Sequence, residues 1–135
     1  MSIEFIEVCP NSVQHCSLLY SLLSERTPEQ SISHKEMPTY EQHLAFIDSK
    51  PYRAWYFVLA EGVAVGAIYL TKQNEIGIAI YQSYCGNGYA WEAIEELMKR
   101  HDGPFLANIN PENYASIGLF RNLGFDLVQE TYKHE

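Results

Sequence analysis

The sequence predicts an α+β fold in which helices and strands are mixed and most of the strands are antiparallel. One observation is a series of strand-like segments over residues 55–81 with only short polar turns between them, which is typical of an antiparallel meander. Another is an amphipathic helix between the last of these segments and a further strand-like run over residues 105–109, which adds one parallel pair. A chain of 135 residues can form one core, so we expect a single domain over residues 1–135.

The N-terminal part predicts one strand and two helices. Residues 3–8 alternate apolar and acidic side chains, as in a half-buried strand. After Ser12, apolar residues recur at helical spacing. Thr39, followed three residues later by Gln42, has the pattern of a capped helix start, and Pro51 ends this second helix.

The middle of the chain predicts three consecutive strands. Residues 55–60, 63–70 and 75–81 are rich in aromatic and β-branched residues, which favour strands. Glu61-Gly62 and the polar residues 71–74 separate them. Because connections this short join antiparallel neighbours, these strands form the meander.

The C-terminal part alternates helices and strands. Apolar residues at helical spacing from Ala90 onward predict an amphipathic helix, and residues 105–109 form a short strand-like run. Asn110 as N-cap, with Pro111 at the first helical position, predicts a last helix. A final strand is expected over residues 125–132.

The charge and the motifs exclude several classes of function. A net charge of −8, with only nine Lys and Arg residues, argues against a nucleic-acid binder, because phosphate contacts require clustered cations. An acidic surface either keeps the protein in solution or favours a cationic substrate. Three cysteines without a CxxC pair, a start without an export signal and the lack of an apolar run approaching ~20 residues predict a cytoplasmic protein that binds no membrane. The sequence contains no HExxH motif and no Cys/His cluster, so we expect no metal site.

A glycine-containing loop precedes the amphipathic helix. Gly86 and Gly88 lack a Cβ and tolerate positive φ, so successive N–H groups can point into one concavity at the helix start. Such a loop binds phosphate without many cations, yet the same sequence also suits a simple tight turn. Neither a Walker phosphate loop nor the dinucleotide pattern GxGxxG occurs here.

Two longer segments resemble one family. Residues 76–93, which end in Gly-x-Gly-Tyr-Ala-x-Glu-Ala, closely resemble the acyl-CoA signature of the GNAT superfamily of N-acetyltransferases, in the form of its ribosomal-protein and amino-sugar-nucleotide branch. Residues 110–125 resemble the second conserved block, which runs from Asn-x-x-Ser to Gly-Phe. The resemblance implies a GNAT-like, mostly antiparallel sheet with helices on both faces. One parallel strand pair, joined by a crossover helix, splays apart.

The resemblance also implies a binding site for acetyl-CoA. By analogy, Asn113 reaches the cofactor from the last helix. The remaining positions hold the pantetheine arm along the strand before the loop (Ile78, Ile80, Gln82) and the pyrophosphate in the loop (Cys85, Gly86, Asn87, Gly88, Tyr89, Ala90).

Two positions depart from the family pattern. Cys85 replaces the usual Arg or Gln of the loop, and it is either a plain small residue or a reactive thiol beside a helix start. Phe120, among the cofactor-contacting positions, replaces a Tyr that many members use to protonate the leaving thiolate. Ser116 is the substitute that we expect near the thiol, although it also suits a purely structural role in its helix.

Acetylation of an amine needs positioning, a stabilised oxyanion and a route for the amine proton. The N–H of Ile78 is expected to polarise the thioester carbonyl. Glu75, at the start of its strand, is the first candidate for the base, acting through water, and an exposed turn residue is the alternative. His34 is a second candidate base.

We expect the acceptor to be a small-molecule primary amine, and aromatic residues such as Tyr52 and Trp55 favour an amino-sugar nucleotide. The alternatives are a protein or peptide N-acetyltransferase, a non-catalytic acyl-CoA-binding or regulatory module, and a structural domain whose glycine loop is coincidental. We expect a monomer or a homodimer that uses no metal.

Overall fold

The computed structural model describes residues 3–27 and 36–135. Four strands form one sheet in chain order. Every neighbouring pair is antiparallel, which confirms the predicted meander. The strands are β1 (Ile3–Glu7), β2 (Ala54–Ala60), β3 (Val63–Leu70) and β4 (Ile76–Ile80).

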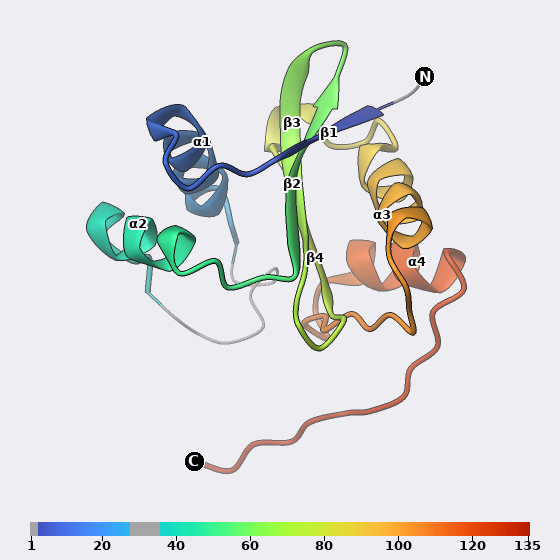
Figure 1. Ribbon diagram of the computed structural model, residues 1–135. Coiled ribbons are helices and arrows are strands. Elements are labelled where there is room, and N and C mark those ends of the chain that lie inside the picture. Colours follow the sequence, from blue (N-terminus) through green and yellow to red (C-terminus); the bar gives the residue numbers. More distant parts are fainter. Residues whose placement is uncertain (1–2, 28–35) are drawn as a thin grey trace.

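Helices cover both faces of this sheet, as Figure 1 shows. On one face lie α1 (Val13–Ser24) and α2 (Tyr40–Asp48), and on the other lie α3 (Tyr89–Arg100) and α4 (Tyr114–Asn122). A short 3₁₀ turn, η2 (Gln82–Tyr84), leads from β4 into α3. The Thr39 hydroxyl and the Gln42 side chain form the predicted capping box at the start of α2.

Alternation along the strands gives the sheet two cores, one beneath each pair of helices. On the α3 side, Ala93, Ile94 and Leu97 form the buried stripe of the helix. On the α1 side, Cys16 and Leu19 pack in a cluster with strand residues. Burial of an aliphatic side chain of this size contributes roughly 1.5–3 kcal/mol, so both helices are firmly attached to the sheet.

The expected parallel pair exists, but it is confined to a single bridge between Glu75 and Leu106. The Ile76 N–H donates to the Leu106 carbonyl at 2.7 Å, and the Leu106 N–H donates to the Asn74 carbonyl at 2.9 Å. Beyond Leu106 the chain leaves β4 without a further bridge among the residues that the structure describes. A gap therefore opens at this edge of the sheet, and it positions the site described below.

The predicted start of the last helix is wrong by one turn. The N-cap is Asn113, whose side chain accepts the Ser116 N–H at 3.2 Å, and not Asn110. Asn110 instead closes a separate turn, because its side chain accepts the Glu112 N–H and its carbonyl accepts the Asn113 N–H. Pro111 therefore lies in this turn and not at the first helical position.

The predicted final strand is also wrong, since residues 125–135 contain no regular secondary structure. The segment runs away from the domain as an extended tail (Figure 1), and Leu127 and Val128 are exposed. A strand-like sequence forms a strand only where a neighbour completes its hydrogen bonds, and no described strand pairs with this segment. Within the described residues, no helix has the length and apolar character needed to cross a bilayer.

Candidate active site

The glycine loop reaches α3 in the conformation that an anion site requires. Gly86 and Gly88 have φ of 84° and 81°, in the left-handed region, and an added Cβ would meet nothing at either position. Gly88 is the N-cap of α3 and offers no side chain to its first turn, whose N–H groups have no intrahelical partner. The Asn87 side chain donates to the Tyr84 carbonyl at 2.9 Å and holds the loop. The helix dipole and the unpaired N–H groups together favour a bound anion here.

Other loop residues have structural contacts that limit their roles. The exposed Cys85 thiol lies 3.6 Å from the Tyr81 carbonyl oxygen, so it points back toward the end of β4. Tyr89 and Ala90, the first residues of α3, are half-buried, and Tyr89 packs against the core. As residues of the first turn of α3, both have backbone N–H groups without an intrahelical partner.

The outer edge of β4 has backbone groups that β3 does not use. The Tyr81 N–H bonds to the Val65 carbonyl on β3, whereas the Ile76 N–H points the other way, to Leu106. Because N–H directions alternate along a strand, those of Ile78 and Ile80 point the same way as that of Ile76, into the gap. Gln82, which we expect to contact the pantetheine arm, lies just past this strand in η2, and its N–H donates to the Glu25 carboxylate at 2.7 Å.

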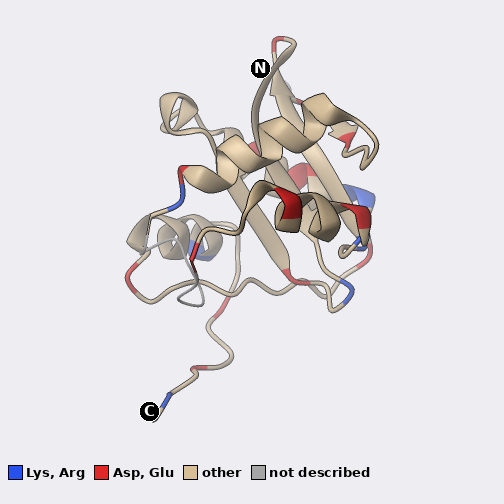
Figure 2. Cartoon of the chain, turned by 90° about the vertical axis from the view of Figure 1, so that its left-hand side faces the viewer, with Lys and Arg blue, Asp and Glu red and all other residues tan. Residues whose placement is uncertain are grey.

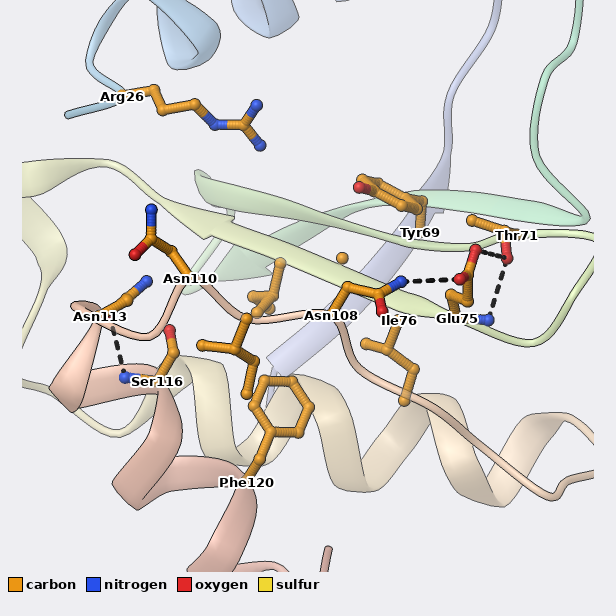
Figure 3. Close-up of a pocket in the computed structure, with 13 residues that line it drawn as sticks. Arg26, Tyr69, Thr71, Glu75, Ile76, Asn108, Asn110, Asn113, Ser116 and Phe120 are labelled. Carbon is orange, nitrogen blue, oxygen red and sulfur yellow. Dashed lines mark hydrogen bonds between the residues drawn. The ribbon is translucent and has the colours of Figure 1, made fainter. Parts of the chain in front are cut away.

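A cavity of about 160 Å³ occupies the gap between β4 and the segment that diverges from it. Figure 3 shows Arg26 and Tyr69 on one side of β4, with Ser116 and Phe120 on the other. The only charged side chains among the described lining residues are Arg26 and Glu75. The cavity therefore connects the two faces of the sheet and has one charge of each sign.

Glu75 is held by two hydrogen bonds at the rim of this cavity (Figure 3). One carboxylate oxygen accepts from Asn108 Nδ2 at 2.7 Å, and the other accepts from the Thr71 hydroxyl at 3.2 Å. Thr71 is itself fixed, because its Oγ1 accepts the Glu75 N–H at 2.9 Å. The carboxylate is thus a constrained, half-buried acceptor, and not the free turn residue that was the alternative.

Ser116 and Phe120 line the α4 side. Asn113 Oδ1 caps the Ser116 N–H, so Ser116 does not cap the helix, and its hydroxyl points toward the cavity (Figure 3). Phe120 is 4% exposed, and its ring packs edge-on against Phe125 at 5.1 Å. Ser116 and Phe120 are four residues apart on α4 and line the same cavity, so Ser116 presents a hydroxyl beside the ring that has none.

Comparison of the sequence with known protein families identifies the family of this chain. Residues 14–126 match the sequence model of the acetyltransferase (GNAT) domain, which is most of the chain. The chain belongs to the acetyltransferase (GNAT) family.

Solved structures agree with the GNAT assignment at the level of the fold. An acetyltransferase from Thermus thermophilus has a TM-score of 0.73 and 17% identity, over 96% of this chain and 90% of that one. A GNAT superfamily phosphinothricin acetyltransferase from Sinorhizobium meliloti, in complex with AcCoA, has a TM-score of 0.77 and 19% identity, over 96% and 77%. An acetyl transferase from Salmonella typhimurium that modifies the N-terminal serine of ribosomal protein L7/L12 has a TM-score of 0.66 and 16% identity, over 90% and 79%. No curated protein sequence matches the chain.

Several residues of this GNAT domain's cavity were missed by sequence reasoning. Asn108 is a polar residue within an apolar run, and that interruption is the signal that could have found it. Tyr69 was missed because its position depends on register: it pairs with Gly77 on β4, and its ring lies where a Cβ at Gly77 would be. Arg26 follows α1 and has no motif around it.

Among the described residues, no histidine lines the cavity of the GNAT domain. His34, the second candidate base, lies outside the described residues. His43 is 6% exposed, packs against the Tyr20 ring and has its pKa lowered by burial, so it is a neutral core residue. Within the described residues, no group of three or more His, Cys, Asp or Glu side chains could bind a metal.

Proposed function

We propose that this GNAT protein transfers the acetyl group of acetyl-CoA to the primary amine of a small molecule. One observation carries the proposal. The edge of β4 whose N–H groups β3 does not use and the constrained Glu75 carboxylate both line the same cavity. Family membership supplies the reaction class, and the S. meliloti structure with bound AcCoA supports the choice of cofactor.

Two parts of the site suit the two ends of the cofactor. The N–H groups at the start of α3, with Gly86 and Gly88, would bind the pyrophosphate. The edge N–H of Ile80 would bind the pantetheine arm as a neighbouring strand would, which leaves the N–H of Ile78 for the thioester carbonyl at the end of that arm. Asn113 uses its oxygen as the helix cap, and its NH₂ group is the part that can donate to the cofactor.

Each group in the cavity has a defined task in the reaction. The amine nitrogen attacks the acetyl carbon while the Ile78 N–H stabilises the oxyanion. Glu75 accepts the amine proton through a water molecule. The carbon–sulfur bond then breaks, and the Ser116 hydroxyl passes a proton to the CoA thiolate while it takes one from solvent, to which Glu75 releases the amine proton. Phe120 takes no part in the proton transfer, because its ring has no exchangeable proton.

The size of the cavity favours a small acceptor. Pockets for drug-sized ligands measure roughly 300–1,000 Å³, and this cavity measures about 160 Å³. The loop resembles that of the ribosomal-protein and amino-sugar-nucleotide branch. An amino-sugar nucleotide acceptor would place only its sugar inside the cavity. The N-terminus of a protein is the second candidate, favoured by the similarity to the enzyme that acetylates L7/L12.

Calorimetric titration with acetyl-CoA tests the proposal. Gly88→Trp should abolish binding, since a side chain there would fill the space at the helix start. Gly62→Trp is the matched control, because Gly62 has φ of 80°, similarly open surroundings and a position in the β2–β3 turn. We expect the control to bind acetyl-CoA like the parent protein, although each change costs roughly 1–2 kcal/mol of stability. A folded parent protein that binds neither acetyl-CoA nor CoA would contradict the proposal.

A further inference from the structure

Arg26 is a cation that lines the cavity and has no ion pair with another described residue. It follows α1, is exposed and lines the cavity on the side of Tyr69 (Figure 3). Among the described residues its guanidinium has no ion pair, whereas Arg100 pairs with Glu96. A guanidinium beside a cavity, without an ion pair in residues 3–27 and 36–135, can bind an anion from solution.

The wall between Arg26 and Glu75 is aromatic and rigid. Tyr69 stacks on Tyr52 with ring centroids 3.9 Å apart and an interplanar angle of 3°. Burial, followed by the interaction with Tyr69, raises the pKa of Tyr52, and the positive charge of Arg26 partly offsets that rise. The Tyr52 phenol is therefore neutral, and the Arg26 guanidinium lies close enough to interact with it electrostatically. A ligand along this wall would meet a cation at one end and a carboxylate at the other.

The cofactor does not supply the anion for Arg26. The phosphates of CoA would lie at the loop before α3, and the pantetheine and acetyl groups that reach the cavity carry no charge. A polycation is also disfavoured, because its second ammonium group would meet the guanidinium. The acceptor itself is the remaining source of negative charge.

We propose that the acceptor is a primary amine that also carries an anionic group, a carboxylate or a phosphate, with the anion bound by Arg26 and the amine next to Glu75. This inference rests on the proposed acetyltransferase function and narrows its substrate class. An arginine fork binds either oxyanion through paired hydrogen bonds, so both chemistries fit.

Steady-state kinetics on matched acceptors test the inference. One arm compares the common amino acids with their carboxamides, and the other compares glucosamine 6-phosphate with glucosamine. We expect the parent protein to prefer the anionic member of at least one arm, and the arm that responds identifies the anion. In Arg26→Gln, KM for the anionic acceptor should rise about 10- to 100-fold, the range for loss of a charged hydrogen bond. KM for acetyl-CoA and turnover of the neutral acceptors should not change.

Lys99→Gln is the control, because it removes one positive charge from the exposed face of α3, away from the cavity. It should behave like the parent protein in both arms. Equal use of anionic and neutral amines, or an Arg26→Gln variant with unchanged KM, would overturn the inference and leave the acetyltransferase proposal intact. Lack of turnover with every amine, in a protein that still binds acetyl-CoA, would overturn both.

Discussion

At the scale of single residues, Glu75 differs from a surface carboxylate because both of its oxygens are held. The hydrogen bonds from Asn108 and Thr71 fix its rotamer, so it can hold a water molecule in one place beside the cavity. The strand start was visible in the sequence, which is why Glu75 could be a candidate. Its two partners could not be predicted, because Asn108 reaches it only through the single Glu75–Leu106 bridge.

Glu75→Gln should lower kcat about 100- to 10,000-fold, the range for loss of a general base. Asn108→Ala keeps the carboxylate but frees its rotamer, so we expect a smaller loss of about tenfold in kcat. Acetylation assays with saturating acetyl-CoA measure both effects, and calorimetry should show unchanged cofactor binding.

Glu61→Gln provides the control for loss of one negative charge, because Glu61 lies in the exposed β2–β3 turn. It should retain full activity. If Glu75→Gln retained kcat within twofold or so of the parent protein, Glu75 would not be the base.

At the scale of elements, the best-predicted parts are those with local signals. The meander follows from aromatic and β-branched runs separated by short polar turns, α3 follows from helical periodicity, and the capping box marks α2. The start of α4 was misplaced because Asn110 and Asn113 are both good caps, and the turn between them decides which one is used. The final strand was wrong because its formation depends on a neighbour that periodicity does not report.

The aromatic wall of the cavity, which consists of the stacked rings of Tyr52 and Tyr69, depends on how strands β3 and β4 are aligned. The Tyr69 ring covers Gly77 on one side and contacts Tyr52 on the other. Gly77→Ala should force the ring out of place, cost about 1–3 kcal/mol of stability through overpacking, and raise KM for the acceptor. Denaturant unfolding and acceptor kinetics measure the two effects.

Gly118→Ala is the matched change in α4, where an added Cβ meets nothing. It should stabilise the protein by about 0.5–1 kcal/mol, because glycine is unfavourable inside a helix. An alanine at position 77 that left both stability and acceptor KM unchanged would show that the wall does not shape the acceptor site.

At the scale of the whole molecule, an acidic protein is proposed to bind an anionic cofactor. The net charge is −8. In the described part of the chain, Lys and Arg lie on several separate segments (Figure 2). The proposed pyrophosphate site consists of backbone N–H groups, so it needs no basic patch. Composition alone could argue against nucleic-acid binding. It could not reveal this site, because backbone N–H groups do not contribute to the net charge.

The dependence of cofactor affinity on salt tests this arrangement. Raising NaCl screens the long-range repulsion and breaks few direct ion pairs, so the Kd of acetyl-CoA should change by less than about threefold between low and physiological ionic strength. Calorimetry at several salt concentrations measures the change. A Kd that weakened tenfold or more would mean that Lys or Arg side chains hold the phosphates.

The early end of the pairing between β4 and residue 106 also bears on solubility. Beyond Ile76, whose N–H is bonded to Leu106, the outer edge of β4 carries the outward N–H groups of Ile78 and Ile80, and such an isoleucine-rich edge is a template for any other extended chain. In the proposed complex the pantetheine arm covers that edge. The cofactor would then protect the protein against edge-to-edge aggregation, and cells short of CoA would leave this edge uncovered.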